Sequence, residues 1–174
     1  MNIRHHPTTT ATLRFGVGVE KGLNMKSIVA IYGQVTDAFD RVAAPIFDLS
    51  VRIMIGLVFF RSGMQKLDDW ESTIFLFQEE YKVPLLPPEI AAVLGTFNEL
   101  VMPVLLFLGL AARLAVLPLI GMTLVIQFVL GATNPSYDNV EHYYWLALLG
   151  MILVRGPGRL SLDHIIRTKF NPPA

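Results

Sequence analysis

The sequence predicts an all-α integral membrane protein: a four-helix transmembrane bundle preceded by an N-terminal amphipathic interfacial helix. The 174 residues are 53% hydrophobic and only 16% charged, whereas a soluble domain has about 25% charged residues. Four apolar stretches approach the ~20 residues that cross a bilayer as a helix. They cover about residues 48–67, 89–110, 113–130 and 140–155. The loops between them also differ in charge, as loops on opposite sides of a membrane do.

The amino-acid composition excludes several classes of function. The formal net charge is zero, which gives no electrostatic basis for binding nucleic acid. The chain has no cysteine, so thiol catalysis, disulfides and cysteine-held iron–sulfur clusters are excluded. No metal site is predicted. His5 and His6 lie in a polar tail, His142 starts an aromatic-rich helix, and His164 lacks a second ligand at helical spacing.

The residues before the first span divide into a tail and a helix. Residues 1–24 lack the continuous apolar segment of a signal peptide and predict a disordered tail, with Met25 as an alternative start. Residues 25–47 predict an amphipathic helix in the interface plane, or alternatively a helix packed on the bundle. Pro45 should end or kink this helix. Its apolar positions recur at four-and-three spacing: Ile28, Tyr32, Val35, Phe39, Val42 and Ile46.

The first span carries basic residues on one helical face. At about 100° per residue, Gly56, Gly63 and Lys66 fall within about 40° of Arg52. Glycines on this face would let another helix approach closely. A cation in a span avoids lipid by facing the bundle interior and pairing with an anion. Alternatively, Arg52 and Lys66 could extend toward opposite membrane surfaces.

The second span supplies a candidate anion. Glu99 lies near the middle of residues 89–110, where a carboxylate needs a partner or a proton. Arg52 and Lys66 are both candidate partners, and the sequence does not decide between them. Glu99 is therefore expected either to lock two helices together or to carry a proton.

The remaining segments complete the topology. The first loop, which contains a predicted short surface helix from Trp70 to Tyr81, is acidic, whereas Arg113 lies in the second loop. The tail 156–174 is basic and carries a short helix that Ser161 can cap. The excess of basic residues on the cytoplasmic side of membrane proteins then predicts a multi-pass protein with both termini cytoplasmic.

Ordered motifs across residues 48–163 resemble the DoxX family of small membrane proteins with four spanning helices. The matching residues are Arg52-x-x-x-Gly56, Ser62-Gly63-x-x-Lys66-Leu67, Val83-Pro84, Glu99, Gly109-Leu110-x-x-Arg113 and Gly156-Pro157-Gly158-Arg159-x-Ser161-Leu162-Asp163. The resemblance implies a bacterial plasma membrane protein. Some relatives are subunits of thiosulfate–quinone oxidoreductases, and others are encoded with metal-stress proteins.

Two functions follow as hypotheses. In the first, the chain is a subunit of a quinone-linked redox complex in sulfur or oxidative-stress chemistry, and quinone is the candidate cofactor. Its ligand site would consist of Arg52, Gly56, Gly63, Lys66 and Glu99, with Glu99 as a proton carrier. In the second, it is a non-catalytic scaffold or transport-related partner of another protein. Both imply contact with the lipid bilayer and with a protein partner or second copy of the chain.

Overall fold

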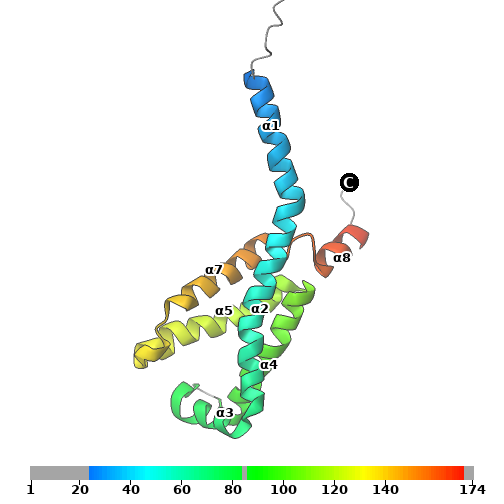
Figure 1. The fold of residues 1–174 in the computed structure, drawn as a ribbon. Helices are drawn as coiled ribbons and strands as arrows, with labels where there is room; N and C mark the ends of the chain where they lie inside the picture. The colour runs from blue at the N-terminus through cyan, green and yellow to red at the C-terminus, as the bar shows by residue number, and fades with distance from the viewer. Residues whose placement is uncertain (1–23, 84–85, 171–174) are drawn as a thin grey trace, which may run out of the picture. The chain divides into compact units, whose positions relative to one another are not determined.

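The structure, a computed structural model, describes residues 24–83 and 86–170. These residues form helices and connecting segments, without any strand (Figure 1). The predicted disordered tail falls almost entirely outside the described part of the chain. The chain divides into two compact units, the first ending at Asp37 and the second beginning at Ala38.

Helical structure runs from Met25 to Asp68 without interruption. It comprises α1 (Met25–Ala38), a π-helical segment η1 (Phe39–Ala43) and α2 (Ala44–Asp68). Of the two outcomes expected at Pro45, an end of the helix is not found, and a kink stays a prediction. Proline has no N–H to donate, and its ring clashes with the carbonyl four residues earlier. The wider π turn before it, in which the Ala44 N–H donates to the Phe39 carbonyl, accommodates that constraint.

The first unit contributes most of α1. None of the α1 residues is buried, and the apolar side chains of Ile28, Tyr32 and Val35 are about half exposed or more. The spacing of these side chains is that of an amphipathic stripe. Placement of the stripe in a membrane interface stays a prediction.

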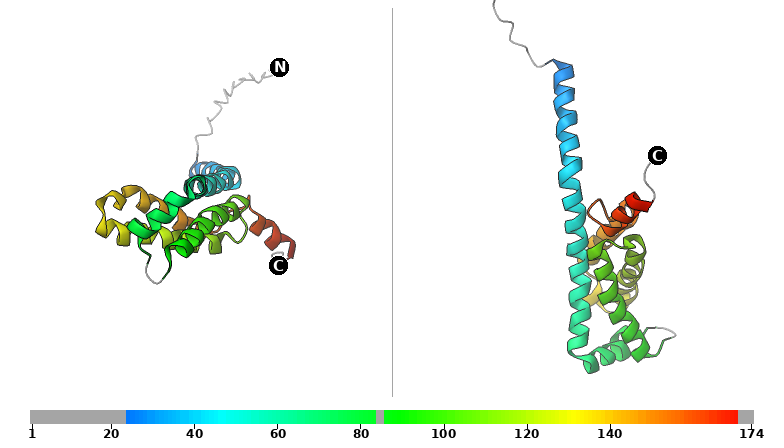
Figure 2. Two further views of the ribbon diagram at one scale, coloured as in Figure 1. Left: turned by 90° about the horizontal axis from the view of Figure 1, so that it is seen from below. Right: turned by 90° about the vertical axis from the view of Figure 1, so that its right-hand side faces the viewer.

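Four longer helices form the body of the second unit. These are α2, α4 (Pro88–Leu108), α5 (Ala112–Leu124) and α7 (Val140–Arg155). α2 packs most extensively on α4 and α5 on α7, while α4 also contacts α5 and α2 contacts α7 (Figures 1 and 2). Each of the four helices therefore packs on the next one along the chain, and α2 also contacts α7, the last of them.

The core lies where these four helices meet, and apolar side chains also cover the outside. Buried aliphatic and aromatic residues from all four helices form one cluster: Val51, Ile55, Phe59, Leu106, Ala112, Ala115, Val116, Leu119, Leu149 and Ile152. Outward-facing Met54, Phe97, Leu117 and Phe128 are also substantially exposed. A soluble domain rarely exposes so many large apolar side chains on contiguous helices, whereas a lipid-facing surface requires them.

Three helical stretches are long and apolar enough to cross a membrane: Met25–Asp68, Pro88–Leu108 and Ala112–Thr133. The last joins α5 to the π-helical η3 (Val125–Leu130) and to α6 (Gly131–Thr133). Helix α7 has 16 residues, or about 24 Å of rise, which is shorter than a ~30 Å hydrocarbon core. The fold is thus that of an all-α membrane protein, while four crossings stay a prediction.

Shorter helices close the two ends of the body. The predicted surface helix is present as α3 (Trp70–Leu76) and the π-helical η2 (Phe77–Tyr81). A 3-10 turn, η4 (Pro135–Tyr137), precedes α7, and α8 (Leu162–Phe170) follows it. The predicted cap of α8 is present, because the Ser161 Oγ accepts a hydrogen bond from the His164 N–H at 3.2 Å.

Candidate functional site

The candidate site is a buried ion pair between Lys66 of α2 and Glu99 of α4. The Lys66 Nζ lies 2.7 Å from one Glu99 carboxylate oxygen and 2.9 Å from the other. It also donates a hydrogen bond to the Ser62 Oγ at 2.9 Å. The Lys66 side chain is 13% exposed and that of Glu99 is 5% exposed. The structure therefore selects Lys66 from the two candidate partners of Glu99.

Local sequence explains this geometry. Ser62 and Lys66 are four residues apart, so one helical face presents both. Gly63 lies between them, packed against α4. A Cβ at that position would come within 2.9 Å of Leu100 side-chain atoms and 3.0 Å of the Glu99 Cβ. The missing side chain lets α4 approach closely enough for the charged groups to meet.

The cluster combines groups that can bind an acceptor oxygen of a ligand with a group that can exchange a proton. An ammonium and a hydroxyl can both donate hydrogen bonds to a carbonyl or an oxyanion. A carboxyl group can accept or release a proton. In a water-poor interior the charges of the pair stabilise each other, although taking both out of water is costly. This arrangement can lock two helices, and it can also bind a polar ligand that competes for one partner.

Arg52 lies in a different part of the body. It precedes Lys66 by 14 positions, which corresponds to about 21 Å along a helix. Its Nη1 donates to the Leu106 carbonyl at 3.1 Å, and its Nη2 donates to the Leu160 carbonyl. The side chain is 0% exposed, so protein encloses it on all sides.

The contacts of Arg52 place its positive charge at the C-terminal end of α4. That end of a helix carries unpaired carbonyls and partial negative charge. Gly109, at φ 63°, ends α4 there, and an added Cβ would collide with the Arg52 Nη1. The guanidinium thus ties α2 to the end of α4 and to the segment before α8. The expected grouping of Arg52 with Lys66 and Glu99 in one pocket is not what the fold builds, because each cation finds its own partner at a different depth.

The other glycine of the predicted ligand face, Gly56, also lies against α4. An added Cβ would contact the aromatic ring of Phe107. Both glycines of that face therefore serve the close packing of α2 on α4. A direct ligand contact at either one stays a prediction.

Tyrosines border the acidic end of the body near the ion pair. Burial raises the pKa of the Tyr81 hydroxyl, and the charges of Glu99 and Glu80 raise it further. Tyr137 donates a hydrogen bond to Glu80. Burial raises the pKa of Tyr137 most, and this hydrogen bond raises it further. The two rings pack edge to face with centroids 6.0 Å apart. They line a cavity of about 380 Å³ between η2 and the end of the α5–α6 helix.

A second polar cluster joins η3 to α7. The Gln127 side chain donates to the Asp138 carboxylate at 2.5 Å and lies 2.7 Å from the Nδ1 of buried His142. The His142 ring packs against Trp145 at a centroid distance of 4.9 Å. The buried side chains of Gln127 and His142 thereby find hydrogen-bond partners within the fold, as buried polar groups require. This cluster is best explained as a connection between helices.

Sequence reasoning missed Ser62, Tyr81 and the Gln127–His142 contact as members of polar clusters. A signal existed for Ser62, because its four-residue spacing from Lys66 is a helical contact distance. None existed for Tyr81 or for Gln127 with His142, since those contacts join separate helices. Their geometry depends on how the helices pack.

Comparison with known proteins identifies the family of the chain. Residues 47–132, which include Arg52, Lys66 and Glu99, match the DoxX family. The chain is also 31% identical over 123 residues to a Bacillus subtilis (strain 168) protein named "Putative oxidoreductase CatD", covering 68% of this chain and 85% of that protein. No solved structure matches. A relative this similar over most of its length, together with the family match, establishes that the chain belongs to the DoxX family.

Proposed function

We propose that this protein is the membrane subunit of a redox complex and that its Ser62–Lys66–Glu99 cluster binds a quinone or a small sulfur anion. The observation that carries the proposal is the ion pair between two apolar helices, with Lys66 still 13% exposed. Ionisable groups within membrane segments are expensive and commonly mark functional sites. The name of the Bacillus subtilis relative points to the same class of chemistry.

The proposed chemistry divides between the chain and its partners. Lys66 and Ser62 hold an oxygen of the ligand by hydrogen bonds, and Glu99 exchanges protons with it. Reducing a quinone to a quinol takes two electrons and two protons. The chain has no cysteine, so the electrons come from a bound cofactor or a partner protein. Arg52 has a structural role in this proposal, because its bonds go to backbone carbonyls.

A second candidate function is a non-catalytic scaffold for another membrane protein. It is favoured by the mutual satisfaction of Lys66 and Glu99, whose geometry needs no further ligand. In that case the pair only fixes α2 against α4. The two functions differ in what accompanies the purified protein.

Purification from native membranes in mild detergent tests the proposal. We expect extraction and mass spectrometry to detect a quinone at near-stoichiometric amounts, with a redox difference spectrum in the ultraviolet. Lys66→Met should lower the quinone content at least tenfold, because the donor to its oxygen is lost. Glu99→Gln should retain the quinone but slow its reduction, because an amide cannot carry the proton.

Gly150→Ala is the matched control, since its added Cβ would meet no atom within 4 Å. It should leave quinone content unchanged. A wild-type preparation with a stoichiometric protein partner and no quinone or sulfur anion would refute the redox proposal in favour of the scaffold. Equal quinone content in wild type and Lys66→Met would refute the assigned site.

A further inference from the structure

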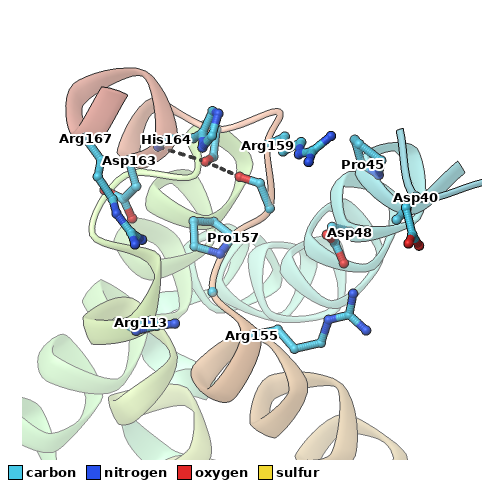
Figure 3. A pocket seen from close by; sticks show the side chains of 14 residues that line it. Asp40, Pro45, Asp48, Arg113, Arg155, Pro157, Arg159, Asp163, His164 and Arg167 are labelled. Atoms are coloured by element: carbon cyan, nitrogen blue, oxygen red, sulfur yellow. Dashed lines mark hydrogen bonds between the residues drawn. The ribbon is translucent and has the colours of Figure 1, made fainter. Parts of the chain in front are cut away.

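A cavity of about 550 Å³ lies at the end of the body opposite the acidic loop, outside the Ser62–Lys66–Glu99 cluster. Segments far apart in sequence form it: the start of α2, the start of α5, the end of α7 with the loop that follows it, and the first turns of α8. Figure 3 shows arginine side chains around it from several of these segments. We call it the arginine cavity, after the four arginines that line it: Arg113, Arg155, Arg159 and Arg167.

One of the three acidic residues that line the arginine cavity, Asp163, is committed to backbone hydrogen bonds. The Asp163 carboxylate accepts backbone hydrogen bonds from Ala111 at 2.8 Å and from Ala112 at 3.1 Å. It therefore satisfies donors at the start of α5. Asp48 and Asp163 both lie near enough to the buried guanidinium of Arg52 for their charges to act on it. Asp40 is exposed at the rim.

The arginines, in contrast, retain free donors. The Arg113 Nη2 donates to the Val154 carbonyl at 3.1 Å. Across residues 24–83 and 86–170, no ion pair involves any of the four guanidinium groups, because the pair found there joins Lys66 to Glu99. Unpaired guanidinium groups around a concave site favour an anion with several acceptor oxygens, such as a phosphate group.

The loop after α7 packs closely against two side chains that line this cavity. Gly156 and Gly158 have φ of 87° and 80°, a region that side-chain-bearing residues rarely adopt. A Cβ on Gly156 would come within 3.3 Å of the Arg113 guanidinium, and one on Gly158 within 2.7 Å of the Asp48 carboxylate. The absence of side chains at these two glycines thus lets the loop backbone pass directly against the charged side chains of Arg113 and Asp48.

Apolar side chains beside the arginines favour a phospholipid as the molecule that carries such a phosphate group. The first turns of α8 expose Leu162, Ile165 and Ile166, and the last residue exposes Phe170. Arg167 and Lys169 lie on the same short helix. Inorganic phosphate has no apolar part that could contact these side chains, whereas a phospholipid carries acyl chains next to its phosphate. Basic pockets between membrane helices are a recognised form of anionic lipid site.

We propose that the arginine cavity binds the phosphodiester of an anionic phospholipid, with α8 covering the adjoining acyl region. Arg155 and Arg159 flank the Gly-Pro-Gly loop and donate to the phosphate oxygens. Arg113 fixes the wall through its bond to Val154. This assignment is independent of the redox proposal, because the two sites share no residue.

Lipid retention by the full chain, measured by native mass spectrometry, tests the assignment. The protein is held in micelles and titrated with phosphatidylglycerol or cardiolipin, and in parallel with phosphatidylcholine. We expect one tightly retained anionic lipid and no comparable phosphatidylcholine adduct. Arg155→Gln and Arg159→Gln should each weaken retention roughly fivefold, the effect of one basic residue near an anionic membrane surface. The double variant should weaken it about 25-fold, the product of two such effects.

Arg61→Gln is the control, because Arg61 is exposed on α2 and does not line the cavity. It should leave retention unchanged. An equal loss with Arg61→Gln, or equal retention of phosphatidylcholine, would overturn the proposal. So would displacement of the lipid by millimolar inorganic phosphate alone, which would assign the cavity to a free anion. A folded double variant that retains the lipid as well as wild type would also overturn it.

Discussion

Replacing Glu99 with leucine should separate the energy of the Lys66–Glu99 pair from the rest of the α2–α4 contact. The change removes the acceptor of two hydrogen bonds, at 2.7 and 2.9 Å, from the Lys66 ammonium. Lys66 then keeps its bond to Ser62 but loses its compensating charge. Breaking a buried pair in this way costs roughly 3–5 kcal/mol. Because Lys66 is 13% exposed, it can reach some water, and we expect the lower value of about 3 kcal/mol.

The double variant Lys66→Met with Glu99→Leu provides the decisive comparison. Replacing both members of a buried pair with apolar side chains of similar volume is often neutral or stabilising. We therefore expect it to unfold at nearly the same free energy as wild type. Lys66→Met alone should also cost about 3 kcal/mol, because it leaves the Glu99 carboxylate unpaired. The coupling energy, which is the cost of the double variant minus the costs of the two single variants, should then be about −6 kcal/mol, far beyond the ~0.5 kcal/mol of independent sites.

Reversible unfolding in mixed micelles, followed by tryptophan fluorescence, measures these free energies. Glu99→Gln belongs in the same series, because its amide oxygen still accepts a hydrogen bond. Its cost should fall nearer to about 1–2 kcal/mol. Additive effects of the two single substitutions would show that the pair contributes no interaction energy. The packing of α2 on α4 would then have to rest on its apolar contacts alone.

Three further predictions concern packing, pH and topology. Gly63→Ala should destabilise the protein by about 1–3 kcal/mol through overpacking, whereas Gly150→Ala should be neutral or slightly stabilising in the same thermal melts. Hydrogen bonds at the start of α3 hold the pKa of Asp69 below its usual range. The capping contribution is therefore present above about pH 4 and is lost as pH falls through the lowered pKa. Asp69→Asn should remove this pH dependence from Trp fluorescence, and its persistence would assign the effect to another carboxylate. For topology, a cysteine at Ser136 should react with an impermeant thiol reagent in spheroplasts while one at Thr168 should not, and the reverse result would invert the orientation.

The sequence alone determined the class of the protein and the identity of its unusual residues. Composition and the length of the apolar stretches predict helices in a membrane, because a bilayer requires ~20 apolar residues per crossing and internally satisfied backbone groups. The same requirement makes Arg52, Lys66 and Glu99 conspicuous, since each charge there needs a compensating partner. These constraints act on single helices, and periodicity along the chain is enough to see them.

The tertiary structure decided which groups the charged side chains of α2 bind. Arg52 and Lys66 lie on one face of α2, and the sequence offers Glu99 to both. The packing of α4 brings Glu99 opposite Lys66 and brings the carbonyl of Leu106 opposite Arg52. Spacing along one helix fixes the direction in which a side chain points, but the distance to another helix depends on how deeply the two interlock. At Gly63 that depth is set by contact with Leu100.

The arginine cavity illustrates the same division. In the sequence, each of its arginines belongs to a basic loop or tail. That charge pattern predicts only which side of the membrane the loop or tail lies on. Their convergence depends on the start of α5, the end of α7 and the start of α8 meeting at one end of the body. Local composition determined that this end is basic. Only the long-range packing of the helices determined that its charges surround one concave site, because Arg113 and Arg167 come to line the same cavity only after the chain has folded.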